Sequence, residues 1–235
     1  MNDLNEMTRW WRGEAASHGR SVIDMTLRGS ENWAALLTNG QQEVARAVSI
    51  TGMRTGPEWS CLEVGCGIGR LTFALGERFG HVTGVDVNCE FIETARIHND
   101  RLNVCFEAAD GRQLSPRSGK TFDVIFSYEV FHYLPDGTLK SYISAAYNLL
   151  RSSGQLVFEF NTRPIFWRTR TAAIIRSCLN MVGVREWRGF PTARGARRIP
   201  RTVQELSEHL QGAGFHLKTV IGENTSATWF VAERP

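Results

Sequence analysis

The sequence predicts an α/β protein with a doubly wound, mainly parallel sheet. Three observations predict it. Short apolar runs typical of buried strands alternate with segments of helical periodicity. Consecutive strands are far enough apart for crossover helices. A glycine-rich turn, residues 65–69, follows the first strand directly. Ligands of such sheets bind beyond the carboxyl ends of the strands, where the strand order reverses.

Composition limits the class of protein. The length of 235 residues fits one α/β domain with an embellishment. Contents of 42% hydrophobic and 22% charged residues exclude a disordered or fibrous chain. No stretch approaches the ~18 apolar residues of a membrane helix, and the polar start is not a secretory signal. The five cysteines are odd in number and form no CxxC pair, which favours a reduced, cytoplasmic compartment.

The first fifty residues differ from the rest. Residues 1–30 show no clean period, whereas apolar positions in residues 31–50 recur at helical spacing. We expect residues 1–50 to form an N-terminal helical cap. Residues 51–235 would form the main domain, with an insertion at residues 161–201.

The remaining elements follow in order. A loop with two glycines and a proline spans residues 51–58. The last two strands have no long helix between them, so we expect an antiparallel hairpin. A turn at residues 152–154 precedes the fifth strand. The predicted strands are 59–64, 81–87, 103–108, 122–127, 155–160, and two near 215–221 and 228–232; the predicted helices are 70–79 (closed by Gly80), 89–98, 138–150 and 203–210, with a further helix possible over 165–182.

The glycine turn and two acids fit a nucleoside site. The turn reads Gly65-Cys-Gly-Ile-Gly69, and its glycines allow a sharp bend and close approach of a ligand. Its spacing fails the GxGxxG dinucleotide fingerprint, and no P-loop lysine follows. Asp86 ends the second strand, where a carboxylate can bind ribose hydroxyls. Asp110 follows the third strand, where it could read an adenine amino group. Either acid alone could be a surface residue or a helix cap.

With these features the chain resembles the class I S-adenosylmethionine-dependent methyltransferases. The matching stretches fall within about residues 59–160: Leu62-Glu-Val-Gly-Cys-Gly-Ile-Gly69, Gly84-Val-Asp-Val87, Ala109-Asp-Gly111, Phe122-Asp-Val-Ile-Phe-Ser127 and Leu150-Arg-Ser-Ser-Gly-Gln-Leu-Val157. The resemblance implies a Rossmann-like, seven-stranded sheet with its last strand antiparallel. It also implies S-adenosyl-L-methionine as the cofactor.

Site roles follow from the same resemblance. The loop would lie under the methionine moiety, Asp86 would bind the ribose, and Ala109 with Asp110 would flank the adenine. Ser127 and Tyr128 would border the sulfonium. The full set of expected cofactor residues is Glu63, Gly65, Cys66, Gly67, Gly69, Arg70, Asp86, Val87, Ala109, Asp110, Gly111, Ser127 and Tyr128.

Two residues after the fourth strand are candidates for the chemistry. Methyl transfer from a sulfonium needs alignment and exclusion of water, and a hydroxyl acceptor also needs a base. His132 is the candidate general base because imidazole titrates near neutral pH; alternatively it caps a helix or packs beside the cofactor. Glu129 could orient the acceptor or the cofactor, or be a solvated loop acid. We find no motif for a metal.

Four residues are candidates for the acceptor site. His18 lies in the N-terminal region expected to fold over the site. Trp33 could close over the cofactor or stack on an acceptor, although ordinary packing is the simpler interpretation. Arg163 and Trp167 belong to the insertion at residues 161–201.

The insertion at residues 161–201 holds ten arginines and one acid, Glu186, a charge of +9 that leaves −6 for the rest of a chain of net charge +3. It could be a packed lid with solvated arginines, a pocket for an anionic acceptor, or a nucleic-acid or membrane surface.

The sequence therefore predicts an S-adenosylmethionine-dependent methyltransferase acting on a small molecule, possibly anionic. A hydroxyl is the expected acceptor. The alternatives are an RNA methyltransferase that uses the basic segment, and a non-catalytic cofactor-binding protein. The oligomeric state is left open.

Overall fold

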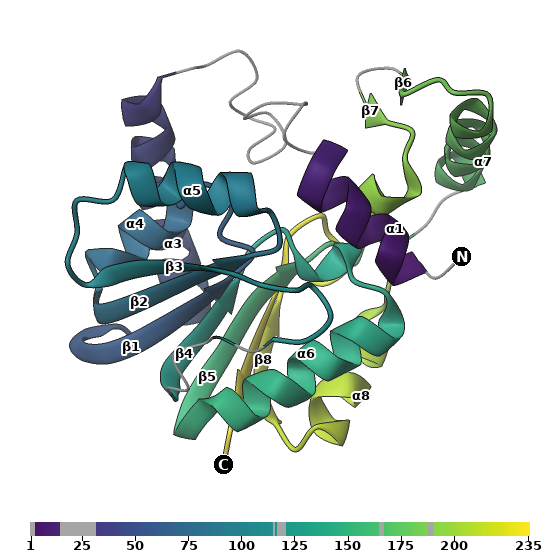
Figure 1. The fold of residues 1–235 in the computed structure, drawn as a ribbon. Helices are drawn as coiled ribbons and strands as arrows, with labels where there is room; N and C mark the ends of the chain where they lie inside the picture. Colours follow the sequence, from purple (N-terminus) through teal and green to yellow (C-terminus); the bar gives the residue numbers. More distant parts are fainter. Residues whose placement is uncertain (1–2, 15–31, 115, 117–120, 165–166, 188–189) are drawn as a thin grey trace.

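A computed structural model describes residues 3–14, 32–114, 116, 121–164, 167–187 and 190–235 (Figure 1). Its first half contains α1 (Asp3–Arg9), the helical turn η1 (Trp10–Glu14), α3 (Trp33–Thr51), β1 (Gly56–Val64), α4 (Arg70–Gly76), β2 (Phe79–Asp86), α5 (Cys89–Ile97), β3 (Val104–Ala108) and β4 (Phe122–Ser127). The second half contains η4 (Phe131–Tyr133), α6 (Asp136–Leu149), β5 (Leu150–Phe160), α7 (Trp167–Met181), β6 (Glu186–Trp187), β7 (Phe190–Pro191), η5 (Arg194–Ala196), α8 (Val203–Gly212), β8 (His216–Ile221) and β9 (Thr228–Glu233).

One sheet of seven strands runs in the order β3-β2-β1-β4-β5-β9-β8. Strands β1 to β5 pair in parallel, and β9 pairs antiparallel with both β5 and β8. The predicted mainly parallel sheet with an antiparallel last strand is therefore confirmed. The strand order reverses between β1 and β4, so a ligand site is expected at the carboxyl ends of these two strands.

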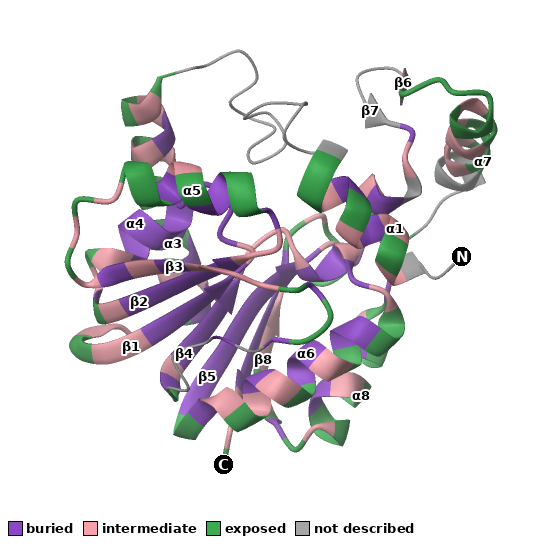
Figure 2. Ribbon diagram, viewed as in Figure 1, coloured by how far each residue is buried: buried purple, intermediate pink, exposed green. Residues whose placement is uncertain are grey.

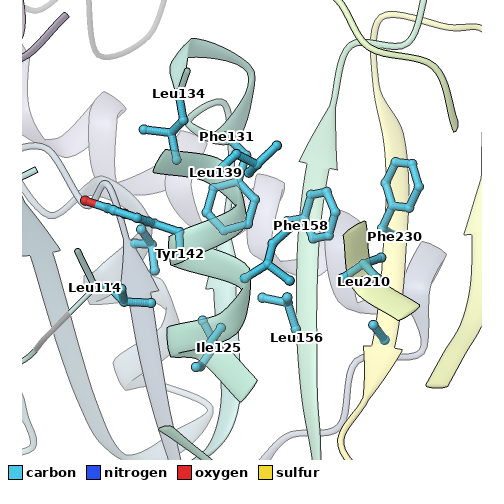
Figure 3. Close-up of a cluster of buried hydrophobic side chains, with 14 of the residues drawn as sticks. Leu114, Ile125, Phe131, Leu134, Leu139, Tyr142, Leu156, Phe158, Leu210 and Phe230 are labelled. Carbon is cyan, nitrogen blue, oxygen red and sulfur yellow. The ribbon is translucent and has the colours of Figure 1, made fainter. Parts of the chain in front are cut away.

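Each face of the sheet carries its own apolar core. Buried residues of α3, α4 and α5 pack on one face, and those of α6 and α8 pack on the other. Figure 2 shows the buried strands between these helix layers. On the α6 and α8 side, Phe158 lies between Phe131 and Phe230, with ring centroids 5.0 and 4.9 Å apart (Figure 3).

Two local predictions were wrong. Phe79 was expected to end a helix, but α4 ends at Gly76 and Phe79 begins β2. Its backbone pairs with Gly56 of β1, and its side chain is buried. Residues 152–154 were expected to form a turn before the fifth strand, but β5 already begins at Leu150. Leu150 pairs with Phe122, and the register shifts before Gln155 pairs with Val124.

The described N-terminal residues pack against the insertion. Helix α1 lies beside η5, where the buried ring of Trp10 joins an apolar cluster that includes Ile68 and Phe91. Helix α7 projects from the body of the molecule (Figure 1). Among the described helices, none is long and apolar enough to cross a bilayer.

Candidate functional site

The glycine loop lies at the point where the strand order reverses. Gly65 has φ +79°, and a Cβ there would come within 2.2 Å of a methyl carbon of Val130. Both the strain and the clash explain why this position needs glycine. The backbone amides of Gly65 and Cys66 donate to the carbonyl oxygen of Val85, at 2.8 and 3.0 Å. Gly69 is the N-cap residue of α4. The loop is thus held in a tight turn that has no room for a side chain at residue 65.

Asp86 ties the loop to the end of β2. Its Oδ2 accepts a hydrogen bond from the amide of Gly67 at 2.9 Å, and its Oδ1 accepts one from Asn88 at 2.8 Å. Burial raises the pKa of Asp86. Val87 follows it, and the side chain of Val87 lies next to Gly111.

Glu63 is the second-last residue of β1 and lies two residues before Gly65. Its carboxyl is buried, with Oε2 2.6 Å from the Thr72 hydroxyl that donates to it. Burial raises the pKa of Glu63 to about 7, against the opposing effect of that hydrogen bond. Arg70 is also buried, and its Nη1 donates to Asn39 of α3 at 2.6 Å.

The third strand brings Ala109, Asp110 and Gly111 to the same edge. The amide of Ala109 donates to the carbonyl oxygen of Asp86 at 2.7 Å. Oδ1 of Asp110 accepts hydrogen bonds from the amides of residues 112 and 113, at 2.8 and 3.2 Å. Part of this carboxylate therefore caps a non-helical turn at residues 111–113.

The N-terminal segment reaches this edge. Arg12 donates to the carbonyl oxygen of Asp110 at 2.8 Å, and Asn88 donates to the carbonyl oxygen of Trp11 at 2.7 Å. These contacts place η1 against the loops that follow β2 and β3. Sequence patterns gave no signal for either bond.

The residues after β4 divide into two groups. The Ser127 hydroxyl donates to the carbonyl oxygen of Val64 at 3.2 Å. The Tyr128 hydroxyl donates to Glu43 of α3 at 3.1 Å, and its ring stacks on Trp229 with centroids 5.6 Å apart. Tyr128 thus faces a pocket between α3 and the β8–β9 hairpin.

The second group is an acid–histidine cluster, formed by Glu129, His132 and Glu159. One potential ligand atom from each lies within 4.8 Å of the others. Nε2 of His132 lies 3.3 Å from Oε2 of Glu129, which also accepts a hydrogen bond from Arg198. Glu129 has φ +61°, a strained conformation for a residue with a side chain. Such strain clusters at functional sites.

Electrostatics set the charge of each member of the cluster. Burial lowers the pKa of His132, which favours the neutral ring. Although burial acts to raise it, the pKa of Glu129 is lowered by His132 and Arg198. Burial, with Glu129, raises the pKa of Glu159 to about 8. The sequence contains no recognisable metal motif, and no sequence pattern pointed to Glu159. The three side chains are of types that bind metal ions, but Arg198 already pairs with Glu129.

The four candidate acceptor residues do not meet in the described structure. Trp33 stacks on His98 with centroids 4.0 Å apart, a packing contact. Arg163 is exposed, and Trp167 begins α7. His18 lies outside the described residues.

Several arginines of residues 161–201 bind within the protein. Arg197 donates to Ser177 and to the carbonyl oxygen of Thr192, at 2.8 and 2.7 Å. Arg201 donates to Asp136 at 2.6 Å, and Arg198 to Glu129. These contacts fit the packed-lid interpretation for this end of the segment.

Comparison with known proteins shows a methyltransferase domain. Residues 61–154 match a family model described as a methyltransferase domain. A ubiquinone biosynthesis O-methyltransferase of Xylella fastidiosa (strain M23) is 28% identical over 183 residues, 76% of this chain and 67% of the relative. One from Marinobacter nauticus is 27% identical over 184 residues, 74% of this chain and 68% of the relative.

Solved structures share the fold. Magnesium protoporphyrin IX methyltransferase (ChlM) from Synechocystis PCC 6803, with bound SAH, aligns with a TM-score of 0.63 at 18% identity, over 96% of this chain and 97% of that one. The DhpI-SAM-HEP complex aligns with a TM-score of 0.65 at 18% identity, over 98% of this chain and 97% of that one. Residues 61–154 therefore form a methyltransferase domain, within an overall fold shared with S-adenosylmethionine-dependent methyltransferases of known structure.

Proposed function

We propose that this methyltransferase acts on a hydroxyl oxygen of a small molecule. The observation that carries the proposal is the pairing of His132 with Glu129 directly after β4, 3.3 Å apart. A hydroxyl must lose its proton as it is methylated, so its methylation benefits from a nearby base, whereas a neutral amine can attack without one. The name O-methyltransferase of the relatives at 28% identity supports the same choice.

The residues at the carboxyl ends of β1 to β4 fit the cofactor. The loop at residues 65–69 turns sharply at Gly65 and is fixed to Asp86 through the amide of Gly67. We propose that this loop carries the methionine moiety, that Asp86 binds the ribose hydroxyls, and that Ala109 and Asp110 flank the adenine. S-adenosylmethionine supplies a methyl group already activated by the positive charge on sulfur.

Residues of the chain would then align the acceptor and exclude water. Burial keeps His132 neutral, the form that can accept a proton, and the neighbouring Glu129 orients the ring. Arg198, which belongs to the 161–201 segment, donates a hydrogen bond to Glu129. This segment would therefore close the acceptor side of the site. Five free cysteines support a reducing compartment, which we propose is the cytoplasm.

The test uses purified protein and methyl-labelled S-adenosylmethionine with panels of phenols, aliphatic alcohols and amines. We expect the label in a methyl ether. Transfer to amines alone would contradict the choice of oxygen. Binding of S-adenosylhomocysteine without transfer to any panel would favour the non-catalytic alternative. Bulk RNA is tested as a further acceptor. Label in the RNA, with a yield that falls steeply as salt is raised, would favour the RNA alternative.

A further inference from the structure

Glu159 is a buried carboxylate that the proposed function leaves without a role. It lies one residue before the end of β5 and is 1% exposed. Within the described parts of the chain, neither carboxylate oxygen has a donor in good hydrogen-bond geometry, although the backbone amide of Glu129 lies near enough to lower the pKa of Glu159. A buried ionisable group without a partner is costly, and natural proteins satisfy such groups unless function requires otherwise. Its open oxygens therefore call for a ligand that donates a hydrogen bond.

The sheet places Glu159 at the edge that carries the cofactor loop. Phe158 pairs with Ser127 of β4, so Glu159 lies beside Tyr128 in the next position. Val64, which directly precedes the loop, pairs with the same Ser127. On the other side, Glu159 pairs with Trp229 of β9. Only β4 therefore lies between β5, which carries Glu159, and β1, which leads into the glycine loop.

Glu159 shares the cluster with a second buried base, His132. Nε2 of His132 faces Glu129, and the His132 ring is packed against Tyr133 and Phe160, with centroids 4.5 and 5.8 Å away. Glu129 is paired with Arg198. Both ring nitrogens of His132 are buried without a hydrogen-bond partner among the described residues, as are both carboxylate oxygens of Glu159. Burial lowers the pKa of His132 but raises that of Glu159, so Glu159 is the stronger base of the two.

We propose that Glu159 is a further catalytic residue, whose carboxylate contacts the acceptor hydroxyl and takes its proton during methyl transfer. This proposal rests on the proposed O-methylation and refines its base: the acceptor proton goes to Glu159 and not to His132. His132 is the weaker base because burial lowers its pKa. The acceptor O–H bond breaks and its proton goes to an Oε atom of Glu159. The oxygen forms the new bond to the methyl carbon, and the electron pair of the broken carbon–sulfur bond stays on sulfur. The protonated carboxyl later returns its proton to water.

The electrostatic surroundings suit this role. Two charged side chains act on Glu159: Glu129, from the turn after β4, and Arg198, from the 161–201 segment. The charge of Glu159 in turn helps to raise the pKa values of Tyr128 and Tyr133. Burial raises the pKa of Glu159 to about 8, so its carboxylate is a much stronger base than an exposed one. A base with a pKa near the working pH is the most effective in proton transfer.

The experiment uses 4-nitrophenol, because its phenol and phenolate forms have different absorption spectra. The probe is added to the protein saturated with S-adenosylhomocysteine, and its ionisation is followed by absorbance as the pH is raised. With Glu159 present, phenolate and carboxylate would be adjacent like charges, so the two groups hold one proton between them. Because Glu159 is a stronger base than the phenolate of this probe, the shared proton stays on the carboxyl and stabilises the phenolate by a hydrogen bond. We expect the bound probe to ionise at a pH about one unit lower in the wild type than in Glu159→Gln.

The controls separate this role from a structural one. Glu159→Asp keeps a carboxylate and should keep most of the shift, and it also serves if Glu159→Gln fails to fold. Glu93→Gln removes an exposed acid of α5 and should behave as the wild type. Equal ionisation in the wild type and Glu159→Gln, or no binding of the probe to the wild-type complex, would overturn the proposal. Failure of the proposed function would show itself differently, as label transfer to amines alone or to no acceptor.

Discussion

The backbone amide of Gly67 donates to Oδ2 of Asp86 over 2.9 Å, which fixes the glycine loop to the end of β2. A second amide, that of Asn88, donates to Oδ1 of the same carboxylate. One side chain therefore sets the shape of the loop and stands where a ribose is expected to bind.

Asp86→Asn should weaken cofactor binding. The amide keeps the size of the side chain but removes the charge, and its NH₂ group faces a backbone donor. Hydrogen bonds to charged groups contribute about 1.5–3 kcal/mol, so the Kd for S-adenosylhomocysteine should rise by about tenfold or more. Calorimetry measures this directly. Asp123→Asn is the matched control, because Asp123 pairs with Arg151 away from the loop; an unchanged Kd in Asp86→Asn would contradict the ribose role.

Glu63 should make the stability of the free protein depend on pH. Burial raises the pKa of Glu63 to about 7 in the folded state, from 4.5. Folding therefore favours the protonated form. The free energy of unfolding should fall as the pH rises from about 4.5 to about 7, by about 1–3 kcal/mol from this group.

Glu63→Gln should remove that dependence. A glutamine can still accept the hydrogen bond from Thr72, and it carries no charge to bury. Denaturant unfolding should show the variant as more stable than the wild type at pH 8, with the difference vanishing below pH 4.5. A variant less stable than the wild type at pH 8 would show that the ionised carboxylate is stabilised by contacts other than those considered.

Local sequence signals predicted the sheet because most of its strands are continuous apolar runs. Strand β4 was predicted with its observed bounds at residues 122–127. The two errors, at Phe79 and at residues 152–154, both depend on pairing with distant strands. Phe79 pairs with Gly56 and Leu150 with Phe122, and such register is set by tertiary contacts rather than by local periodicity.

The candidate site was predictable only where it is local. The glycine loop and Asp86 stand at fixed distances along the chain, so spacing identified them. Glu159 approaches Glu129 only because β5 pairs with β4, and Arg198 lies 69 residues from Glu129. One signal was present: Glu159 is the single acid in the otherwise apolar end of β5, a position where burial demands a reason.

Gly195→Ala should loosen the N-terminal segment. A Cβ at Gly195 would lie 2.5 Å from the carbonyl oxygen of Glu6 and 2.9 Å from both the Cα of Met7 and the Cβ of Trp10. The added methyl group would push α1 away from η5, at a cost of about 1–3 kcal/mol. Hydrogen exchange should increase in residues 3–14 while the central strands stay protected.

The same variant should bind S-adenosylhomocysteine more weakly, because η1 donates from Arg12 to the carbonyl oxygen of Asp110. Gly137→Ala is the control, since a Cβ at Gly137 meets no atom within 4 Å. If hydrogen exchange in residues 3–14 is equal in Gly195→Ala and the wild type, the α1–η5 contact accommodates the added methyl group without loss of stability.

Arg201→Met should detach the end of the basic segment from the start of α6. The guanidinium of Arg201 is buried and donates to the carbonyl oxygen of Leu134 at 2.7 Å and to Asp136 at 2.6 and 2.8 Å. Methionine has a similar length but no donor, so the buried carbonyl would lose its partner. The free energy of unfolding should fall by about 1–3 kcal/mol. Arg163→Met, at an exposed position of the same segment, should leave it within about 0.5 kcal/mol. If both variants lose stability equally, the loss reflects the charge of the segment and not the contacts of Arg201.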